Sequence, residues 1–153
     1  MPTRADAFTP ATPGIATALQ FFTLLMKGDL DAFAQIWTED AVQEHPFGFD
    51  GLTAALTGRD EVVADYRRMF ANRSDMVFTI YDAHQTTDPD CVIIEARGVS
   101  RVNETGKIYD NRYVALFRLR DGRIALNRFY FNPLVTLDTF KGVLIGPGLS
   151  KQD

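Results

Sequence analysis

The stretch from Lys107 to Pro133 constrains the fold most, because it has the pattern of one long β-hairpin. Tyr109 to Arg120 and Arg123 to Asn132 both alternate between apolar or aromatic residues and polar ones, as strands with two different faces do. Between them, Asp121-Gly122 is a two-residue hairpin turn signal. We therefore predict two antiparallel strands joined by a tight turn.

One face of each predicted strand places polar side chains among aromatic rings. Asn111 and Tyr113 share a face in the first strand, and Asn127 shares one with Phe129 and Phe131 in the second. This mixture suits a small, mostly apolar ligand that carries one or two polar groups. A plain sheet packed on helices would show the same alternation, so both interpretations stay open.

The chain before the hairpin predicts three helices. Thr12-Pro13 has the pattern of an N-cap followed by proline at the first helical position, and the helix that it opens ends at Gly28. Asp29 can cap a second, shorter helix, whose apolar residues keep helical spacing as far as Trp37. A third helix is expected from Arg59 to Asn72.

Strands are expected after the third helix. Met76 to His84 and Cys91 to Val102 precede the hairpin, and strong turn sequences separate them, which indicates an antiparallel meander. Ala41 to His45 is a further short extended stretch, restricted at its end by Pro46. Gly48 to Gly58 has a possible helical turn and indicates either a flap beside the mouth of a pocket or a plain connector.

The length of 153 residues is that of one domain with its own core. Residues 1–12 are expected to form a flexible arm, since they lack the apolar core of a signal peptide. Residues 13–145 form the predicted domain and 146–153 a tail. The apolar residues from Leu134 to Ile145 are more suited to covering a sheet or a partner than to free solvent.

Composition narrows the partners and the compartment. The single cysteine, Cys91, cannot form a disulfide within the chain, which favours the cytoplasm. Sixteen Lys and Arg against twenty Asp and Glu give a net charge of −4 without a basic block, which argues against nucleic acid and anionic membranes as partners. No apolar run approaches the roughly 18 residues of a membrane span.

Three local patterns carry a resemblance to a known family: Lys27 to Phe33, Trp37 to Ala41, and Gly58 to Val62. With the order of three helices, a short extra strand and a meander, they resemble the nuclear transport factor 2 superfamily, also called SnoaL-like or ketosteroid-isomerase-like, over nearly the whole chain. The resemblance implies an α+β fold, namely a cone-shaped α+β barrel. In it, three N-terminal helices pack on a curved, mixed, mainly antiparallel sheet.

Within that superfamily the final hairpin is similar to the phenazine-biosynthesis A/B proteins. The similar motifs are Asn111-Arg112-Tyr113, Phe117 to Ile124, and Asn127 to Pro133. Two positions depart from that pattern: Phe129 stands where those proteins carry a glutamate, and their pocket histidine falls near Thr79. Phenazine chemistry is therefore not implied.

Glu44-His45-Pro46 is similar to the Glu-Asp-Pro of ketosteroid isomerases, a resemblance that puts His45 at the general-base position. A neutral imidazole accepts a proton near neutral pH. The aspartate that donates to the oxyanion in that family falls near Ala115, so Tyr113 or Asn111 would have to supply the donor. The alternative is a structural or surface histidine, with Tyr113 and Asn111 as a buried polar pair bonded to the backbone.

Other chemistry is not indicated. Glu95 and Arg97 share one strand face and are expected to pair with charges on neighbouring strands. Two histidines and one cysteine without ligand spacing do not predict a zinc site, and no serine lies in a nucleophile motif. There is no glycine loop of the kind that binds phosphates, so we expect neither a metal nor a cofactor.

Three functions stay open. The first is a small cofactor-independent enzyme that binds an apolar cyclic or polyketide-like molecule and catalyses proton transfer in an isomerisation, dehydration or cyclisation. The second is a non-catalytic small-molecule-binding module, and the third a structural subunit like the β subunit of ring-hydroxylating dioxygenases. A homodimer through the sheet is expected. The predicted catalytic residues are His45, Tyr113 and Asn111, and the predicted ligand-binding residues are Trp37, Phe47, Tyr66, Thr79, Phe129 and Phe131.

Overall fold

The first helix, α1 (Pro13–Lys27), forms where the cap signals place it. This computed structural model describes residues 1–49 and 54–140. The Thr12 hydroxyl accepts a hydrogen bond from the Ile15 N–H at 3.2 Å, with Pro13 at the first helical position. Gly28 ends the helix in the left-handed region, at φ 68°, which glycine adopts without strain. The predicted helix is confirmed.

The second helix, α2 (Leu30–Gln35), is shorter than predicted. Asp29 caps it by accepting from the Ala32 N–H at 3.0 Å, as expected. The extension to Trp37 is wrong, because Trp37 begins strand β2 (Trp37–Glu44). The Ile36 carbonyl accepts from the Ile124 N–H at 2.7 Å, so pairing with a later strand takes over where the helical pattern still continues.

The third helix, α3 (Arg59–Asn72), matches its prediction. Ahead of it, strand β3 (Ala55–Thr57) pairs antiparallel with β2 inside the stretch expected to be a flap or connector. Residues 50–53 of that stretch, where a helical turn was expected, lie outside the described residues. The end of the flap segment is therefore an edge strand of the sheet.

The sheet has seven strands in the order β1-β4-β5-β6-β7-β2-β3. The remaining strands are β1 (Thr3–Arg4), β4 (Arg73–Gln85), β5 (Cys91–Val102), β6 (Ile108–Arg120) and β7 (Arg123–Phe131). All neighbours pair antiparallel except β2 and β7, which run parallel. Asp121 and Gly122 join β6 to β7 with φ of 52° and 73°, the positive values of a tight hairpin turn. The predicted meander and hairpin are confirmed.

The N-terminal segment differs from a simple flexible arm. Thr3 and Arg4 pair with Ile80 and Thr79 at the sheet edge, and Ala5, in the 3-10 turn η1 (Ala5–Ala7), is 2% exposed, so part of the expected flexible arm is packed. Helix α4 (Pro133–Phe140) follows the last strand. The rest of the predicted apolar segment and the tail, residues 141–153, lie outside the described part of the chain.

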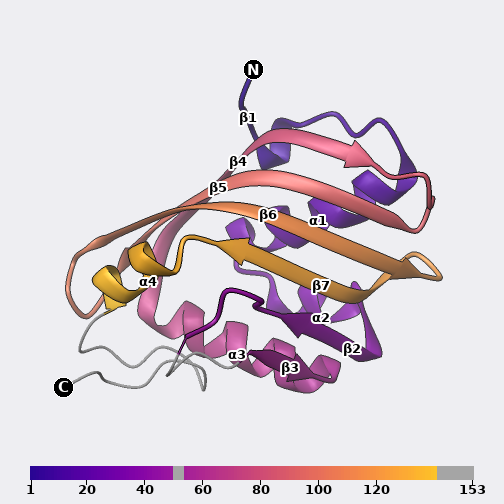
Figure 1. Ribbon diagram of the computed structural model, residues 1–153. Helices are drawn as coiled ribbons and strands as arrows, with labels where there is room; N and C mark the ends of the chain where they lie inside the picture. Colours follow the sequence, from indigo (N-terminus) through magenta and orange to yellow (C-terminus); the bar gives the residue numbers. More distant parts are fainter. Residues whose placement is uncertain (50–53, 141–153) are drawn as a thin grey trace.

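Helices α1, α2 and α3 lie on one side of the curved sheet, while α4 lies beside one end of β6 (Figure 1). We call the helix-covered face the inner face and the opposite one the outer face. The sheet does not close into a barrel, since the edge strands β1 and β3 do not pair with each other in the described residues. The sheet is therefore open, and the predicted α+β fold of helices on a curved, mainly antiparallel sheet is confirmed.

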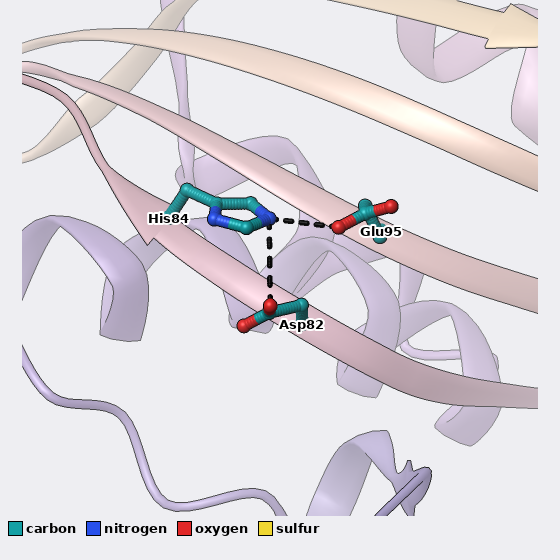
Figure 2. A group of neighbouring side chains, drawn as sticks. All are labelled: Asp82, His84 and Glu95. Atoms are coloured by element: carbon teal, nitrogen blue, oxygen red, sulfur yellow. Dashed lines mark hydrogen bonds and ion pairs between the residues drawn. The ribbon is translucent and has the colours of Figure 1, made fainter.

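Charged side chains on the outer face pair across neighbouring strands. His84 Nε2 lies 2.7 Å from Glu95 Oε2 and 3.7 Å from Asp82 Oδ2 (Figure 2). The guanidinium of Arg97 makes two bonds to the Asp110 carboxylate, of 2.7 and 2.5 Å. The prediction that Glu95 and Arg97 pair with charges on adjacent strands is confirmed.

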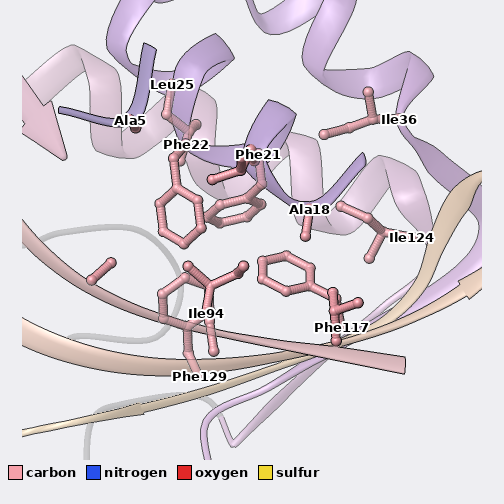
Figure 3. Packing of buried hydrophobic residues seen from close by; sticks show 14 of the residues in the cluster. Ala5, Ala18, Phe21, Phe22, Leu25, Ile36, Ile94, Phe117, Ile124 and Phe129 are labelled. Carbon is pink, nitrogen blue, oxygen red and sulfur yellow. The ribbon is translucent and has the colours of Figure 1, made fainter. Parts of the chain in front are cut away.

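The core lies between α1 and the inner face of the sheet. Phe21 and Phe22 of α1 point toward Phe117 and Phe129 of the final hairpin and Ile94 of β5 (Figure 3). The ring centroids of Phe21 and Phe129 are 5.2 Å apart, and those of Phe21 and Phe117 are 5.6 Å apart. The hairpin that dominates the sequence therefore packs its inner face against α1 in the core.

Candidate functional site

A chain of buried amides crosses the inner face from β2 to β7. Gln43 and Asn127 are directly paired in the parallel register and are 1% and 0% exposed. Gln43 Nε2 donates to Asn127 Oδ1 at 2.8 Å and to Tyr66 Oη at 2.7 Å, and Asn127 Nδ2 donates to the Leu116 carbonyl at 3.2 Å. These bonds join α3 to the sheet inside an otherwise apolar interior.

The acceptor oxygen of Gln43, Oε1, has no hydrogen-bond partner among the described residues. The donor Trp37 Nε1, on the same strand, also has none, and both atoms are buried. Buried polar atoms are almost always bonded, so each marks a position where water or a ligand would be stabilised. Tyr66, which accepts from the Gln43 amide, stays a neutral phenol, because burial raises the pKa of its hydroxyl.

His45 follows the last residue of β2 on the same face as Gln43. Its backbone N–H donates to the Ala54 carbonyl at 2.8 Å, which continues the pairing of β2 with the next segment. The half-buried imidazole lies edge-on to the ring of Phe131, with 6.0 Å between the centroids. Phe131 is the cross-strand partner of Tyr113. The predicted base and the predicted phenol donor therefore flank one aromatic residue of β7.

Tyr113 lies on the inner face as a neutral phenol. Its ring packs at 5.3 Å from that of Phe129 and 6.4 Å from that of Phe78. Burial, with a further contribution from the neighbouring Tyr109, raises the pKa of the Tyr113 hydroxyl well above its ordinary value of 10.0. A phenol that keeps its proton can donate to a ligand oxygen at any physiological pH.

Asn111, predicted as a possible donor to a ligand, has its side chain bonded within the protein. Its amide donates to the Tyr109 hydroxyl at 3.0 Å, the Asn132 carbonyl at 3.0 Å and the Thr136 hydroxyl at 3.3 Å. Its carbonyl oxygen accepts from the backbone N–H of Arg112 and of Asn132. Both ends of the side chain are occupied, so it ties β6 to the start of α4, as in the alternative of a buried polar group bonded to the backbone.

The predicted ligand-binding residues separate into two groups. Trp37, Tyr66 and Phe129 surround the ring of Phe21, with centroids 6.0, 5.7 and 5.2 Å away, and Phe131 lies nearer to His45. Phe47 and Thr79 do not join them. Phe47 is 55% exposed and packs at 5.2 Å from Tyr130 of the outer face.

Thr79 also faces outward. Its neighbours Phe78 and Ile80 are the buried residues of this part of β4, and Thr79 pairs with Arg97 and Arg4 on either side. The sequence did not decide which face Thr79 occupies. The resemblance to the phenazine-biosynthesis A/B proteins placed their pocket histidine only near this position. The register of β4, which contains two irregularities, turns this residue away from the interior.

Sequence reasoning missed two charged residues on the helix side, Arg73 and Asp65. The Arg73 guanidinium carbon lies 4.6 Å from the ring centroid of Tyr109 and 4.4 Å from that of Phe140. Burial raises the pKa of the Asp65 carboxyl even though Arg68 lies 3.9 Å away. The sequence signal that could have indicated Arg73 is its position, since it is a cationic residue between the predicted third helix and the strand that follows it.

The outer face has a groove of about 320 Å³. The side chains that form it include Phe47, Tyr81, Glu95, Arg112, Val114 and Tyr130. Arg112 stacks over the ring of Tyr81 at 4.0 Å. On the same face, donor atoms of Asp82, His84 and Glu95 lie within 4.8 Å of one another, but half-exposed ion pairs account for that arrangement. None of the described helices is long and apolar enough to cross a membrane.

Comparison with known proteins agrees with this architecture. The model of the SnoaL-like domain family matches residues 18–127. The chain is 30% identical over 129 residues to the uncharacterized protein YesE of Bacillus subtilis, covering 82% of this chain and 86% of that protein. It is 31% identical over 120 residues to an uncharacterized PhzA/B-like protein of Pseudomonas aeruginosa, covering 78% and 84% of the two chains.

A solved structure is similar over nearly the whole fold. It is the crystal structure of a Bacillus subtilis protein proposed to be an isomerase. The two structures superpose with a TM-score of 0.78 at 27% sequence identity, over 87% of this chain and 96% of the other. The family match, residues 18–127, runs from within α1 to the middle of β7.

Proposed function

The chain belongs to the SnoaL-like family, and we propose that it is a small enzyme that binds an apolar cyclic or polyketide-like molecule inside the cone and catalyses proton transfer. The family fold supports binding of a small molecule between helices and sheet. The reaction class is isomerisation, dehydration or cyclisation, and the proposed chemistry uses the residues of this chain without a cofactor.

His45 is the proposed base. Its imidazole removes a proton from the carbon next to a ligand carbonyl, and the electron pair of that C–H bond moves to the carbonyl oxygen, forming an enolate and an imidazolium. Tyr113 donates a hydrogen bond to the enolate oxygen, where negative charge develops. Return of the proton to another carbon gives an isomer, and loss of a β-hydroxyl as water gives a dehydrated product.

One observation carries this proposal. The imidazole of His45 packs against Phe131, and Phe131 is the cross-strand partner of Tyr113. Base and donor therefore approach the same aromatic surface from two different strands, and their surroundings are apolar. A ligand carbonyl at Tyr113 would present its neighbouring carbon toward β7 and the imidazole beyond it.

The test is deuterium incorporation from heavy water into the apolar ketone 2-tetralone, followed by NMR. Wild-type protein is expected to accelerate the exchange, and His45→Ala to lower the rate by about 10²–10⁴-fold with the ketone affinity within a few fold. His84→Ala is the matched control, because this histidine lies on the outer face, and it should exchange like wild type. Equal rates in wild type and His45→Ala would remove His45 from the mechanism.

A non-catalytic binding module is the second candidate, favoured by two observations. Asn111 has no donor left for a ligand, and Ala115 stands where the resemblance places the oxyanion aspartate. On this alternative, 2-tetralone would bind to the wild type without any exchange above the rate in buffer. Binding and exchange measured on the same samples therefore separate the two functions.

A further inference from the structure

We infer that Arg73 binds an anionic group of the ligand, so the substrate class is an apolar molecule that carries a carboxylate. This inference rests on the proposed function, since it assumes that the ligand lies inside the cone. It adds a recognition residue that neither the proposed base nor the proposed donor supplies.

The guanidinium of Arg73 is held between two aromatic rings. Arg73 is the first residue of β4, directly after α3, and pairs with Val102 at the end of β5. Tyr109 and Phe140, the rings on which it stacks, contact each other edge-on at 4.9 Å. This arrangement orients the planar guanidinium and leaves it half-buried, and the partial removal from water lowers the pKa of Arg73 without removing its charge.

That cation lacks an anion among the described residues. None of their carboxylates makes an ion pair with it, and its buried Nε has no hydrogen-bond partner there. By contrast, the half-buried guanidinium of Arg128 and the exposed one of Arg97 each bond a carboxylate, of Glu44 and Asp110. Buried charges are normally paired, because removing them from water is costly. A ligand carboxylate would meet that need.

Arg73 lies near other titratable groups but makes no ion pair with a described one. Asp65 lies close enough for each charge to affect the other, and burial raises the pKa of its carboxyl. Tyr66 and Tyr113 also face this charge, and both keep their protons at neutral pH because burial raises the pKa of their hydroxyls. The ion pair of Asp65 is with Arg68, at 3.9 Å, which leaves Arg73 without a carboxylate of its own among the described residues.

The geometry also explains how an anion would position the ligand. An arginine fork can bond both oxygens of one carboxylate, which fixes the direction of the group attached to it. Since Arg73 stacks over Tyr109, which shares the inner face of β6 with Tyr113, a carboxylate there would leave the apolar body of the ligand against the inner-face aromatic residues. Arg73 is then a positioning residue for the reaction at His45.

The experiment compares two probes of the same shape, 2-naphthoate and 2-naphthamide, by titration calorimetry at neutral pH. Wild-type protein should bind the naphthoate about tenfold or more tightly than the amide. Arg73→Met should abolish that preference while the amide affinity stays within about threefold, and Arg73→Lys should keep part of it. Arg112→Met is the control, because Arg112 is also stacked on a ring but on the outer face.

Each other outcome contradicts the inference. Equal binding of both probes to the wild type would overturn it and leave the proposed function standing. Loss of both probes in Arg73→Met and in Arg73→Lys would show a structural role only. A preference lost in Arg112→Met instead would place the anion in the outer groove. If neither probe binds to the wild type, both the inference and a ligand site inside the cone are wrong.

Discussion

Gly98 of β5 lies directly beneath the ring of Phe78, so close that a Cβ on Gly98 would be 2.7 Å from Phe78 Cε1. The same Cβ would be 3.0 Å from Tyr113 Cε2. Glycine inside a strand often marks such a close approach. Because Gly98 has no side chain, the rings of Phe78 and Tyr113 can both pack against its backbone.

We predict that Gly98→Ala lowers the free energy of unfolding by about 1–3 kcal/mol, because the added methyl group overpacks the interior. Urea denaturation measures the change. The double variant Gly98→Ala/Phe78→Leu should lose less than the sum of the two single variants, since the smaller leucine leaves room for the methyl group. Strict additivity would show that Phe78 is not the residue in conflict.

Tyr66→Phe should destabilise the protein by about 1–2 kcal/mol. The substitution removes the hydroxyl that accepts from Gln43 Nε2 at 2.7 Å and leaves a buried N–H without that partner. Chemical denaturation at neutral pH checks it. Tyr81→Phe, on the outer face, is the matched control and should stay within about 0.5 kcal/mol of wild type. Equal effects of the two substitutions would contradict a role of the buried amide network in stability.

Tyr113→Phe is expected to slow ketone exchange by about 10²–10³-fold, because a donor to the developing oxyanion is lost. Its effect on tyrosine titration is a separate readout. The pKa of Tyr113 is raised well above 10.0, so the rise in tyrosinate absorbance near pH 10.0 should be the same in wild type and variant. A smaller rise in the variant would show that Tyr113 titrates normally and is accessible to water.

The prediction for Asp65→Asn is a change in pH dependence. Burial raises the pKa of Asp65 above 3.8, so between the unfolded and folded pKa values the native state binds more protons than the unfolded state. The wild type therefore loses stability as pH rises through that window, and the asparagine variant does not. The variant should gain stability relative to wild type from acid to neutral pH, as measured by denaturation at a series of pH values.

Asp110→Asn is the control for the sign of that effect. Its hydrogen bond to Arg97 lowers the pKa of Asp110, so this carboxylate stabilises the native state above the ordinary pKa of 3.8 and loses that effect as pH falls. The residue is well exposed, so the effect should stay below about 1 kcal/mol. If Asp65→Asn and Asp110→Asn have pH dependences of the same sign, the explanation by burial fails.

We predict a homodimer through the outer face of the sheet, which Val114→Glu should weaken. Val114 is 42% exposed in the centre of that face, beside Tyr130 and the groove. Sedimentation should show a dimer for the wild type at micromolar concentration and a shift toward 17.1 kDa for the variant. Leu134→Glu, at a 72% exposed position of α4, should leave the dimer intact. A wild type that sediments only as a monomer refutes the prediction.

Much of the fold could be predicted because its signals are local. Thr12, Asp29 and Gly28 mark helix ends through bonds within one turn, and Asp121-Gly122 defines the hairpin by its own backbone angles. Trp37 shows the limit. Its spacing continued the helical stripe of α2, but pairing with Ile124, distant in sequence, made it the start of a strand.

The candidate site was harder to predict from the sequence, because it also depends on contacts between residues that are distant along the chain. The resemblance that suggested His45 and Tyr113 says which strand they are on, but the partners of Asn111 come from Asn132 and Thr136, beyond the end of the hairpin. The predictions that Phe47 and Thr79 bind a ligand depended on which face of the sheet each residue occupies. A loop or an irregular strand register changes that face. The burial of Arg73 results from Tyr109 and Phe140, residues that no local pattern connects with it.

Strands β2 and β7 are neighbours in the sheet but distant along the chain, since the bonds between Gln43 and Asn127 and between Arg128 and Glu44 each join residues 84 positions apart. On the ribosome, His45 leaves the exit tunnel well before its partner strand has been translated. Until then, β2 is an open edge that the nascent chain cannot cover. The pairing of β2 with β7, and with it the bond from Gln43 to Asn127, can therefore form only after Arg123 to Phe131 have been translated.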